Sequence, residues 1–283
     1  MTEVRPSPSL APAVPRTTPS DAATLRAEGV SMGYDQLRVI EGLDLELAAG
    51  RVTAIVGPNA CGKSTLLRGL ARLHPLEAGR VLLGERDVAT LSRKELARAV
   101  GVLPQASVAP DGVRVAELVG RGRYPHQGWF GRQRSDDDAV VMRALDATGV
   151  ADLADRPVAE LSGGQRQRVW IAMVLAQETD VVLLDEPTTY LDVAHQVELL
   201  DLLRDLNRDR GTTVVMVLHE LNLAARYADQ LVVMSAGQVV AQGAPGDVLT
   251  EDSVLRAFGL EARVVPDPVS GTPLVVPVGR HRG

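Results

Sequence analysis

The apolar residues of this chain gather in short, unbroken runs separated by helical stretches. Each run is four or five residues long and rich in Val and Leu, which is typical of a parallel strand buried on both faces. Parallel strands need long crossover connections, and the segments between the runs are long enough to supply helices. The pattern predicts an α/β fold with a parallel sheet, whose strands lie at residues 52–56, 99–103, 181–184 and 214–218.

Polar groups follow each predicted strand at its carboxyl end. A glycine-rich loop follows the first strand, and a polar residue closes each of the other three. Ligands of open α/β sheets bind at this edge. We therefore expect one site that gathers Lys63, Gln105, Asp185, Glu186 and His219.

The glycine-rich loop matches the phosphate-binding pattern G-x-x-x-x-G-K-[ST] in full, between a predicted strand and a predicted helix. Gly57 and Gly62 allow tight turns that direct backbone N–H groups at phosphate oxygens. Lys63 is expected on the β- and γ-phosphates, Ser64 on Mg²⁺, and Thr65 near the α-phosphate. A chance glycine turn is the alternative, but the chain has only two lysines, and one stands here. The remaining loop residues are Pro58, Asn59, Ala60 and Cys61.

The other strand ends carry groups that an ATPase needs. Asp185 is placed to hold Mg²⁺, and Glu186 is the candidate for polarising the attacking water. His219 is expected to contact the γ-phosphate, and Gln105 to offer a carbonyl oxygen to Mg²⁺ or the water. The alternatives are a polar strand end before a proline turn for the two carboxylates, and a structural role for the histidine.

A second candidate anion site lies at residues 161–165, Leu-Ser-Gly-Gly-Gln. Ser162 and Gln165 have the spacing of a capping box, with Gly163 and Gly164 between them. A glycine-flanked helix start exposes N–H groups that can meet an anion. On its own, this pattern fits an ordinary capped helix equally well.

Together these motifs resemble the ATP-binding subunit of an ABC transporter over roughly residues 25–260. The resemblance maps the phosphate loop to 57–65, the Q-loop to Gln105, the signature to 161–165, the magnesium strand to 181–186 and the switch histidine to His219. It implies a P-loop NTPase (RecA-like) core with an N-terminal antiparallel β subdomain and an inserted α-helical subdomain.

The same resemblance implies ATP and Mg²⁺ as cofactors and a head-to-tail homodimer. Ser162 and Gly164 of one copy would meet the γ-phosphate held by Lys63 of the other. It further implies that Tyr34 stacks on adenine and that Asp192 belongs to a loop contacting the opposite monomer.

Four segments add to the resemblance: residues 120–127, 188–196, 219–229 and 267–274. They make the chain similar to importers of ferric siderophores. Glu220 and Cys61 depart from residues common in that group. The likeness implies two integral membrane permease subunits as partners, an indirect link to a substrate-binding protein, and a place on the cytoplasmic face of the membrane. Haem and cobalamin importers share parts of the pattern.

Composition narrows the function classes. The formal net charge of −6 argues against a general nucleic-acid surface. One cysteine excludes an intramolecular disulfide and suits a reducing cytosol. No apolar run approaches the ~18 residues that span a bilayer, and the first residues do not resemble a secretory signal. Any transport function is therefore expected to need separate membrane subunits.

The chain divides into three expected parts: a disordered tail at 1–22, an ATPase domain at 23–260 and an extension at 261–283. A helical subdomain is inserted at about 92–165, with a helix at 136–150 capped by Ser135. Residues 231–234 and 238–241 predict a hairpin, and the last stretch predicts a helix followed by a Pro-rich extension. The segment 120–131 is the expected docking surface for a membrane partner, against the alternative of a plain surface loop.

Two other function classes fit the sequence less well. A soluble ABC ATPase acting on DNA or ribosomes usually carries a coiled-coil insert, a second ATPase half or a basic arm, and none is evident here. A different P-loop enzyme, such as a kinase or GTPase, is disfavoured by the signature at 161–165 and by the lack of an N-K-x-D guanine motif.

Overall fold

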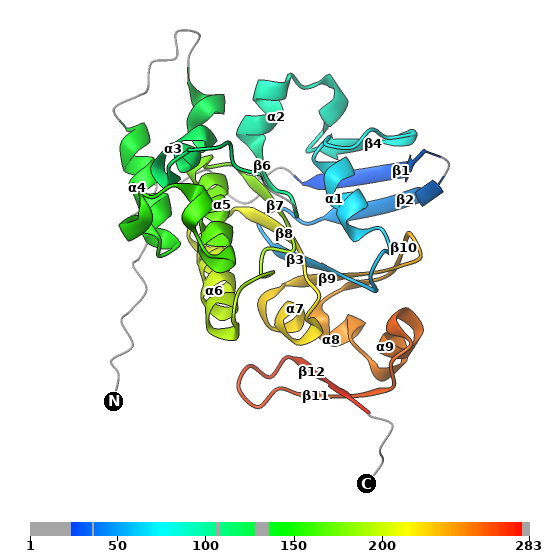
Figure 1. Ribbon diagram of the computed structural model, residues 1–283. Helices are drawn as coiled ribbons and strands as arrows, with labels where there is room; N and C mark the ends of the chain where they lie inside the picture. The colour runs from blue at the N-terminus through cyan, green and yellow to red at the C-terminus, as the bar shows by residue number, and fades with distance from the viewer. Residues whose placement is uncertain (1–23, 36, 106–107, 128–135, 279–283) are drawn as a thin grey trace, which may run out of the picture.

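The computed structural model describes residues 24–35, 37–105, 108–127 and 136–278. Its centre is a six-stranded sheet in the order β10-β9-β3-β8-β7-β6 (Figure 1). The four predicted strands are confirmed as parallel neighbours, and β9 adds a fifth parallel strand beside β3. The strands are β3 (Val52–Val56), β6 (Val100–Leu103), β7 (Val181–Asp185), β8 (Thr213–Val217), β9 (Gln230–Ser235) and β10 (Gln238–Gly243).

Alternate residues of the central strands bury themselves in two separate cores. Ala54 and Leu184 face the core made with α5, α6 and α7, whereas Ile55 and Leu183 face the core made with α1 and a second sheet. This burial on both faces explains the unbroken apolar runs in the sequence. The helices are α1 (Lys63–Leu70), α5 (Gly163–Ala176), α6 (Val193–Arg210) and α7 (Leu221–Tyr227).

The second sheet is antiparallel and has the order β2-β1-β4-β5, as predicted for the N-terminal part. Leu25, Met32 and Leu47 point from it into the core shared with α1. Its strands are β1 (Leu25–Tyr34), β2 (Leu37–Leu47), β4 (Ala78–Leu83) and β5 (Arg86–Asp87), and a 3₁₀ turn η1 (Val88–Thr90) follows.

Helices dominate residues 92–165, although this range also holds β6, which pairs within the central sheet. The buried Arg123 ties the helical part to the end of α5, since its guanidinium donates to Asp137 Oδ1 (2.9 Å) and to Ala176 O (2.8 Å). The elements are α2 (Arg93–Ala99), α3 (Val115–Gly120), η2 (Arg121–His126), α4 (Asp137–Ala147), η3 (Ala151–Leu153) and η4 (Val158–Glu160). The N-cap of α4 is Asp136; the predicted cap, Ser135, lies outside the described residues.

The C-terminal segment is more ordered than predicted. Two helices, α8 (Pro245–Val248) and α9 (Glu251–Phe258), precede a hairpin of β11 (Ala262–Pro266) and β12 (Pro273–Pro277). Proline lacks a backbone N–H but is tolerated at strand ends and sheet edges, and Pro266 faces Pro273 beside the turn. The predicted β9–β10 hairpin is confirmed. Among the described residues, no helix is both long and apolar enough to cross a membrane. The predicted tail at 1–22 lies outside them.

Candidate nucleotide site

The loop between β3 and α1 has the geometry of a phosphate cradle. Ala60 and Gly62 adopt positive φ angles of 60° and 102°, which turn the chain sharply before α1. A Cβ added at Gly57 would overlap the carbonyl oxygen of Met234 on β9, so the loop packs against the neighbouring strand at a point where only glycine fits. The next helix begins after Gly62 without a side-chain cap, and the N–H groups in the first turn of a helix have no partners within the helix.

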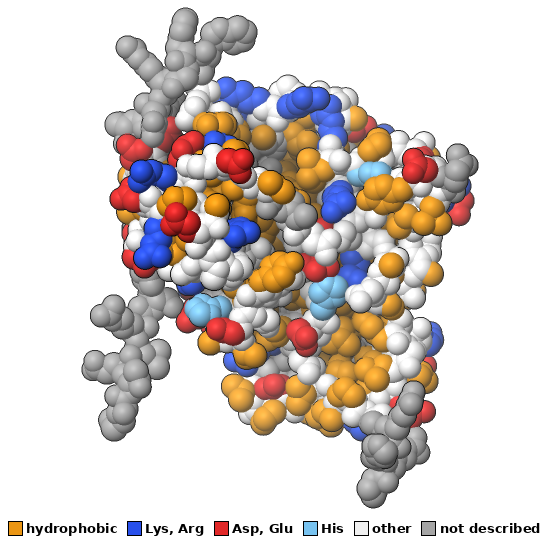
Figure 2. Space-filling view, viewed as in Figure 1, with side chains coloured by type: hydrophobic (Ala, Val, Ile, Leu, Met, Phe, Trp, Pro, Cys, Tyr) orange, Lys and Arg blue, Asp and Glu red, His pale blue; other side chains and the backbone are white. Residues whose placement is uncertain are grey.

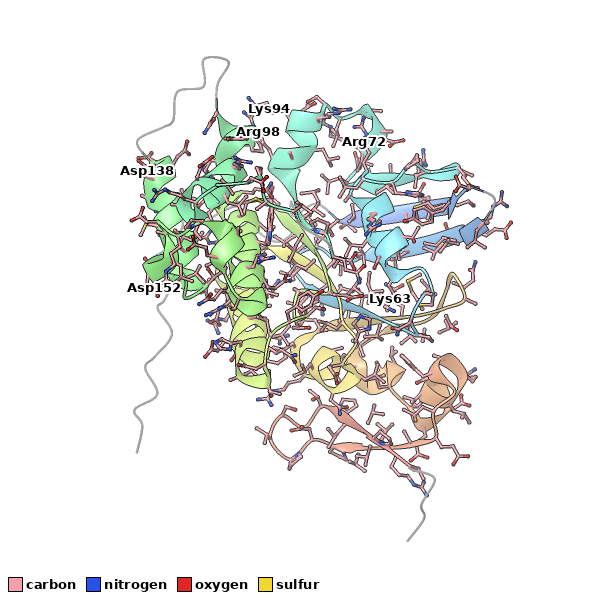
Figure 3. The ribbon with its side chains drawn as sticks, viewed as in Figure 1. Lys63, Arg72, Lys94, Arg98, Asp138 and Asp152 are labelled. Atoms are coloured by element: carbon pink, nitrogen blue, oxygen red, sulfur yellow. The ribbon has the colours of Figure 1, made fainter. Side chains whose placement is uncertain are left out.

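Lys63 lies at the first position of α1 and turns back over the loop (Figure 3). Its Nζ donates to Gly57 O at 2.9 Å and to Pro58 O at 2.7 Å, and the residue is buried. The two carbonyl oxygens satisfy an ammonium group that would be costly to bury unpaired. The ammonium is therefore held at the loop, ready to exchange a carbonyl partner for a phosphate oxygen.

Ser64 and Asp185 meet between α1 and the end of β7. The Ser64 hydroxyl donates to Asp185 Oδ1 at 2.8 Å. Asp185 is buried, and its other oxygen, Oδ2, has no hydrogen-bond partner in the described structure. Burial raises the pKa of this carboxyl, and the nearby Glu186 carboxylate adds to the increase. An unpaired buried oxygen beside a hydroxyl is a donor set that suits Mg²⁺, so these residues fit the predicted metal.

Glu186 and His219 form a pair across the ends of β7 and β8. His219 Nε2 lies 2.7 Å from Glu186 Oε1, and the Thr189 hydroxyl donates to Glu186 Oε2 at 3.4 Å. Glu186 has a φ of 53°, which a non-glycine residue adopts only when its surroundings hold it there. The backbone thus directs the carboxylate into the space above the phosphate loop instead of along the strand.

A single open pocket joins these groups. Nine of its lining residues were predicted from the sequence: five loop residues (Asn59, Ala60, Gly62, Lys63, Ser64), together with Thr65, Gln105, Glu186 and His219. Leu37 and Val39 of β2 complete the lining and were not predicted. Leu37 is 69% exposed. A large apolar side chain that is exposed beside a pocket indicates a surface that a ligand can cover. Figure 2 shows this face of the molecule, hollowed between the helical part and the sheets.

Tyr34, predicted to stack on adenine, ends β1 and is 42% exposed. Its ring lies against the ring of His74, with 4.5 Å between centroids, and His74 Nε2 lies 2.8 Å from Gly33 O. Tyr34 is not among the described residues that line the pocket. Its contact with adenine stays a prediction.

The signature segment forms a capped helix start, as predicted. Ser162 Oγ accepts from Gln165 N (3.2 Å), while Gln165 Oε1 accepts from Ser162 N (3.1 Å). Ser162 and Gly163 are exposed, and the described lining of the pocket includes no residue from 161–165. One copy of the chain therefore does not bring its signature to its own phosphate loop.

The loop after Glu186 runs beside this helix start. A Cβ on Gly164 would lie 3.3 Å from Tyr190 O, so the helix and the loop pack closely. Asp192 ends the loop as the N-cap of α6 and accepts from His195 N (2.9 Å) and His195 Nδ1 (2.8 Å). The backbone N–H of His195, followed by its ring, lowers the pKa of Asp192. Asp192 is exposed, and so remains accessible to another molecule.

Comparisons with known proteins agree with this geometry. Residues 40–189 match the ABC transporter family. The ferric enterobactin transport ATP-binding protein of Escherichia coli (strain K12) is 52% identical to this chain, over 91% of the chain and 95% of that protein.

Solved structures show the same likeness. An inward-facing metal-chelate type ABC transporter superimposes with a TM-score of 0.77 at 30% identity, covering 92% of this chain and 98% of that one. A dimeric bacterial ABC transporter cassette gives a TM-score of 0.72 at 25% identity, covering 78% of this chain and 98% of the cassette chain.

Cys61 offers a direct test of ligand binding at the loop. It is the single cysteine, it is buried, and burial raises the pKa of its thiol, with Lys63 opposing the increase. A raised pKa leaves less thiolate at a given pH, so alkylation by N-ethylmaleimide should be slow at pH 7 and faster as the pH rises. Bound ATP should slow it further by covering the loop. Mass spectrometry of labelled protein over time measures the rate.

Cys61→Ser is the control, and it should take up no label. If ATP leaves the labelling rate of the unmodified protein unchanged at every pH, the loop does not hold the nucleotide.

Proposed function

Because this chain belongs to the ABC transporter family, we propose that it is the ATP-hydrolysing subunit of an importer for ferric siderophores. One observation carries the catalytic part of this proposal. Lys63, Ser64, Glu186 and His219 line a single pocket, and the buried Asp185 is bonded to Ser64 at its edge. The arrangement provides cationic, metal-binding and basic groups around one phosphate position.

We assign each of these side chains a step in hydrolysis. Glu186 accepts a hydrogen bond from the attacking water and orients it toward the γ-phosphate. His219 holds the Glu186 carboxylate in place, and we also assign it to the γ-phosphate. Lys63 and the loop N–H groups stabilise the charge that gathers on the transferring phosphoryl group. Asp185, Ser64 and Gln105 would hold Mg²⁺, which supplies further charge neutralisation when bound.

A second copy of the chain completes the site. Within the described structure, no residue of the signature at 161–165 lines the chain's own pocket, and Ser162 and Gly163 are exposed. In a head-to-tail pair, Ser162, Gly163, Gly164 and Gln165 of one copy would close over the γ-phosphate bound by the other. Asp192 would lie at the same interface. ATP binding closes this pair, and hydrolysis reopens it.

The proposed membrane partners are two permease subunits, with the chain on the cytoplasmic face of the membrane and a substrate-binding protein acting indirectly. The docking surface is proposed at 120–131, of which the structure describes 120–127. Two basic residues of α2 support this segment: Lys94 Nζ donates to Gln127 O (2.5 Å) and Arg98 Nε to Pro125 O (2.7 Å). Both are labelled in Figure 3. Gln105 lines the nucleotide pocket, and we propose that it transmits changes there to this region.

The cargo is proposed from likeness, because no residue of this subunit would touch it. The relative named above is a ferric enterobactin transport ATP-binding protein, and its similarity extends over 91% of this chain. Haem, cobalamin or another metal complex is the alternative cargo. Growth of a strain lacking this gene on defined iron sources tests the choice: we expect loss of growth on ferric siderophores and normal growth on haem. Growth on every siderophore would contradict the proposal.

Glu186→Gln tests the proposed base. The amide keeps the size of the side chain but cannot take a proton from water, so hydrolysis should fall at least 100-fold while ATP binding persists. The variant should accumulate as an ATP-bound dimer, measured by light scattering after gel filtration. The exposed Glu198→Gln on α6 is the control and should turn over normally. Normal turnover in Glu186→Gln would remove this residue from the mechanism.

Ser162→Arg tests the composite site. A bulky cation at the signature should block closure of the pair, so hydrolysis should be abolished while the monomer still binds ATP. Ser92→Arg is a matched control, because Ser92 forms the same kind of capping box with Glu95 at the start of α2. Fluorescent ATP-analogue binding and phosphate release are measured for the isolated subunit. Loss of nucleotide binding in Ser162→Arg would show that the signature serves its own loop.

A further inference from the structure

The C-terminal hairpin has a turn that is fixed by its own hydrogen bonds. Asp267 Oδ1 accepts from the backbone N–H groups of Val269 and Ser270, both at 2.8 Å. The backbone N–H of Asp267 donates to Thr272 O, and its carbonyl oxygen accepts from Gly271 N, both at 2.8 Å. The N–H groups of Ser270 and Val269 lower the pKa of the Asp267 carboxyl. The segment is therefore a defined element and not a loose extension.

One face of the hairpin belongs to the core of the protein. Val275 and Ala262 are buried in the core cluster that contains α7 and the central sheet, and Val264 packs against it. Arg263 also pairs with Glu251 of α9 at 3.3 Å. Figure 1 shows the hairpin lying beneath α7 and α9.

The side chain of Asn222 bonds the hairpin to α7. Asn222 Oδ1 accepts from Val275 N at 2.8 Å, and Asn222 Nδ2 donates to Val275 O at 3.3 Å. The Asn222 side-chain amide thus bonds to both backbone groups of Val275 on the edge of β12, as a residue of a neighbouring strand would. This two-bond contact fixes both the position and the direction of Asn222.

The contact lies at the end of α7 that is nearer to the nucleotide. The far end is anchored to α6, because Tyr227 Oη donates to Asp201 Oδ1 (2.9 Å) and Arg204 donates to Tyr227 O (2.7 Å). The near end begins directly after His219 and Glu220, and Glu220 makes no side-chain capping bond to the helix. The hairpin therefore supplies through Asn222 the restraint that the helix start does not supply for itself.

We infer that Asn222 is a positioning residue for hydrolysis: the hairpin holds the start of α7 through Asn222, so that His219 meets Glu186 and the γ-phosphate. This inference rests on the proposed function, because it assigns His219 to the phosphate. It also gives a role to sequence outside the catalytic site. Asn222 comes three residues after His219, and its partner Val275 directly follows the segment 267–274, so the contact joins parts of the chain that are far apart in the sequence.

Asn222→Leu tests the inference, since leucine fills similar space without either hydrogen bond. We expect kcat for ATP to fall about tenfold with KM within twofold, because small displacements of a catalytic group slow the chemical step. Asn207→Leu is the matched control. Like Asn222, Asn207 makes two side-chain bonds to backbone groups. It donates to Gly50 O (2.9 Å) and Thr212 O (2.8 Å), and these contacts lie away from His219. It should lower the melting temperature and leave kcat unchanged.

A second variant tests whether Asn222 acts through the hairpin. Asp267→Ala removes the carboxylate that fixes the turn. It should lower kcat as well, but by a smaller factor than Asn222→Leu does. Combined with Asn222→Leu, it should add little further loss, because both changes release the same restraint. Additive losses, or a full kcat in Asn222→Leu, would overturn the positioning role.

A readout without turnover separates this inference from the proposed function. The ring ¹⁵N signals of His219, assigned with His219→Gln, should shift in Asn222→Leu and stay in place in Asn207→Leu. If the His219 signals shift in Asn222→Leu but the unmodified protein has no ATPase activity, Asn222 still positions His219 and the proposed function is wrong. Unshifted His219 signals in Asn222→Leu would overturn the positioning role.

Discussion

The parallel pairing of β8 with both β3 and β7 is the constraint on which the site depends. Val217 of β8 lies level with Ile55 of β3 on one side and with Asp185 of β7 on the other. The three strands therefore end at nearly the same height, and the residues that follow them meet above one edge of the sheet. The loop holding Lys63 comes from β3, Glu186 from β7 and His219 from β8. A shift of register in either pairing would separate these groups.

Charged groups placed at such an edge are costly until a ligand arrives. Lys63 is satisfied by carbonyl oxygens of its own loop, and Asp185 shares one oxygen with Ser64 while the other stays unpaired. Little binding energy is lost when a phosphate or a metal ion replaces these partners. A neutral carbonyl or hydroxyl group binds a charged side chain more weakly than a group of full opposite charge does. The pair formed by His219 and Glu186 is of the same kind: it orients both side chains, yet it leaves the pocket open above the loop.

Sequence patterns predict what is local and fail where the fold brings distant residues together. The buried strands, the phosphate loop and the capping box of Ser162 each depend on a few adjacent residues, and the structure has them where predicted. β9 joins the parallel sheet through pairing with β3, a contact that its hairpin pattern does not reveal. Leu37 lies in an ordinary strand pattern, and only the position of β2 beside the loop makes it part of the pocket. The prolines near the C-terminus suggest an irregular extension, whereas their place at strand ends permits a hairpin.

The same fold also connects the two half-sites within one chain. Gln167, one turn into α5, donates through Nε2 to Pro187 O at 3.0 Å, directly after Glu186. Gly164 packs against Tyr190 in the loop that follows. The helix start that we assign to the partner's nucleotide is thus in contact with the segment that carries Glu186, the base that we propose for this chain's own nucleotide. In the closed pair that we propose, a change at Glu186 after hydrolysis would reach the signature of the same chain through these two neighbouring contacts. Because that signature would lie on the other copy's phosphate, neither site would react without altering the fit of the other.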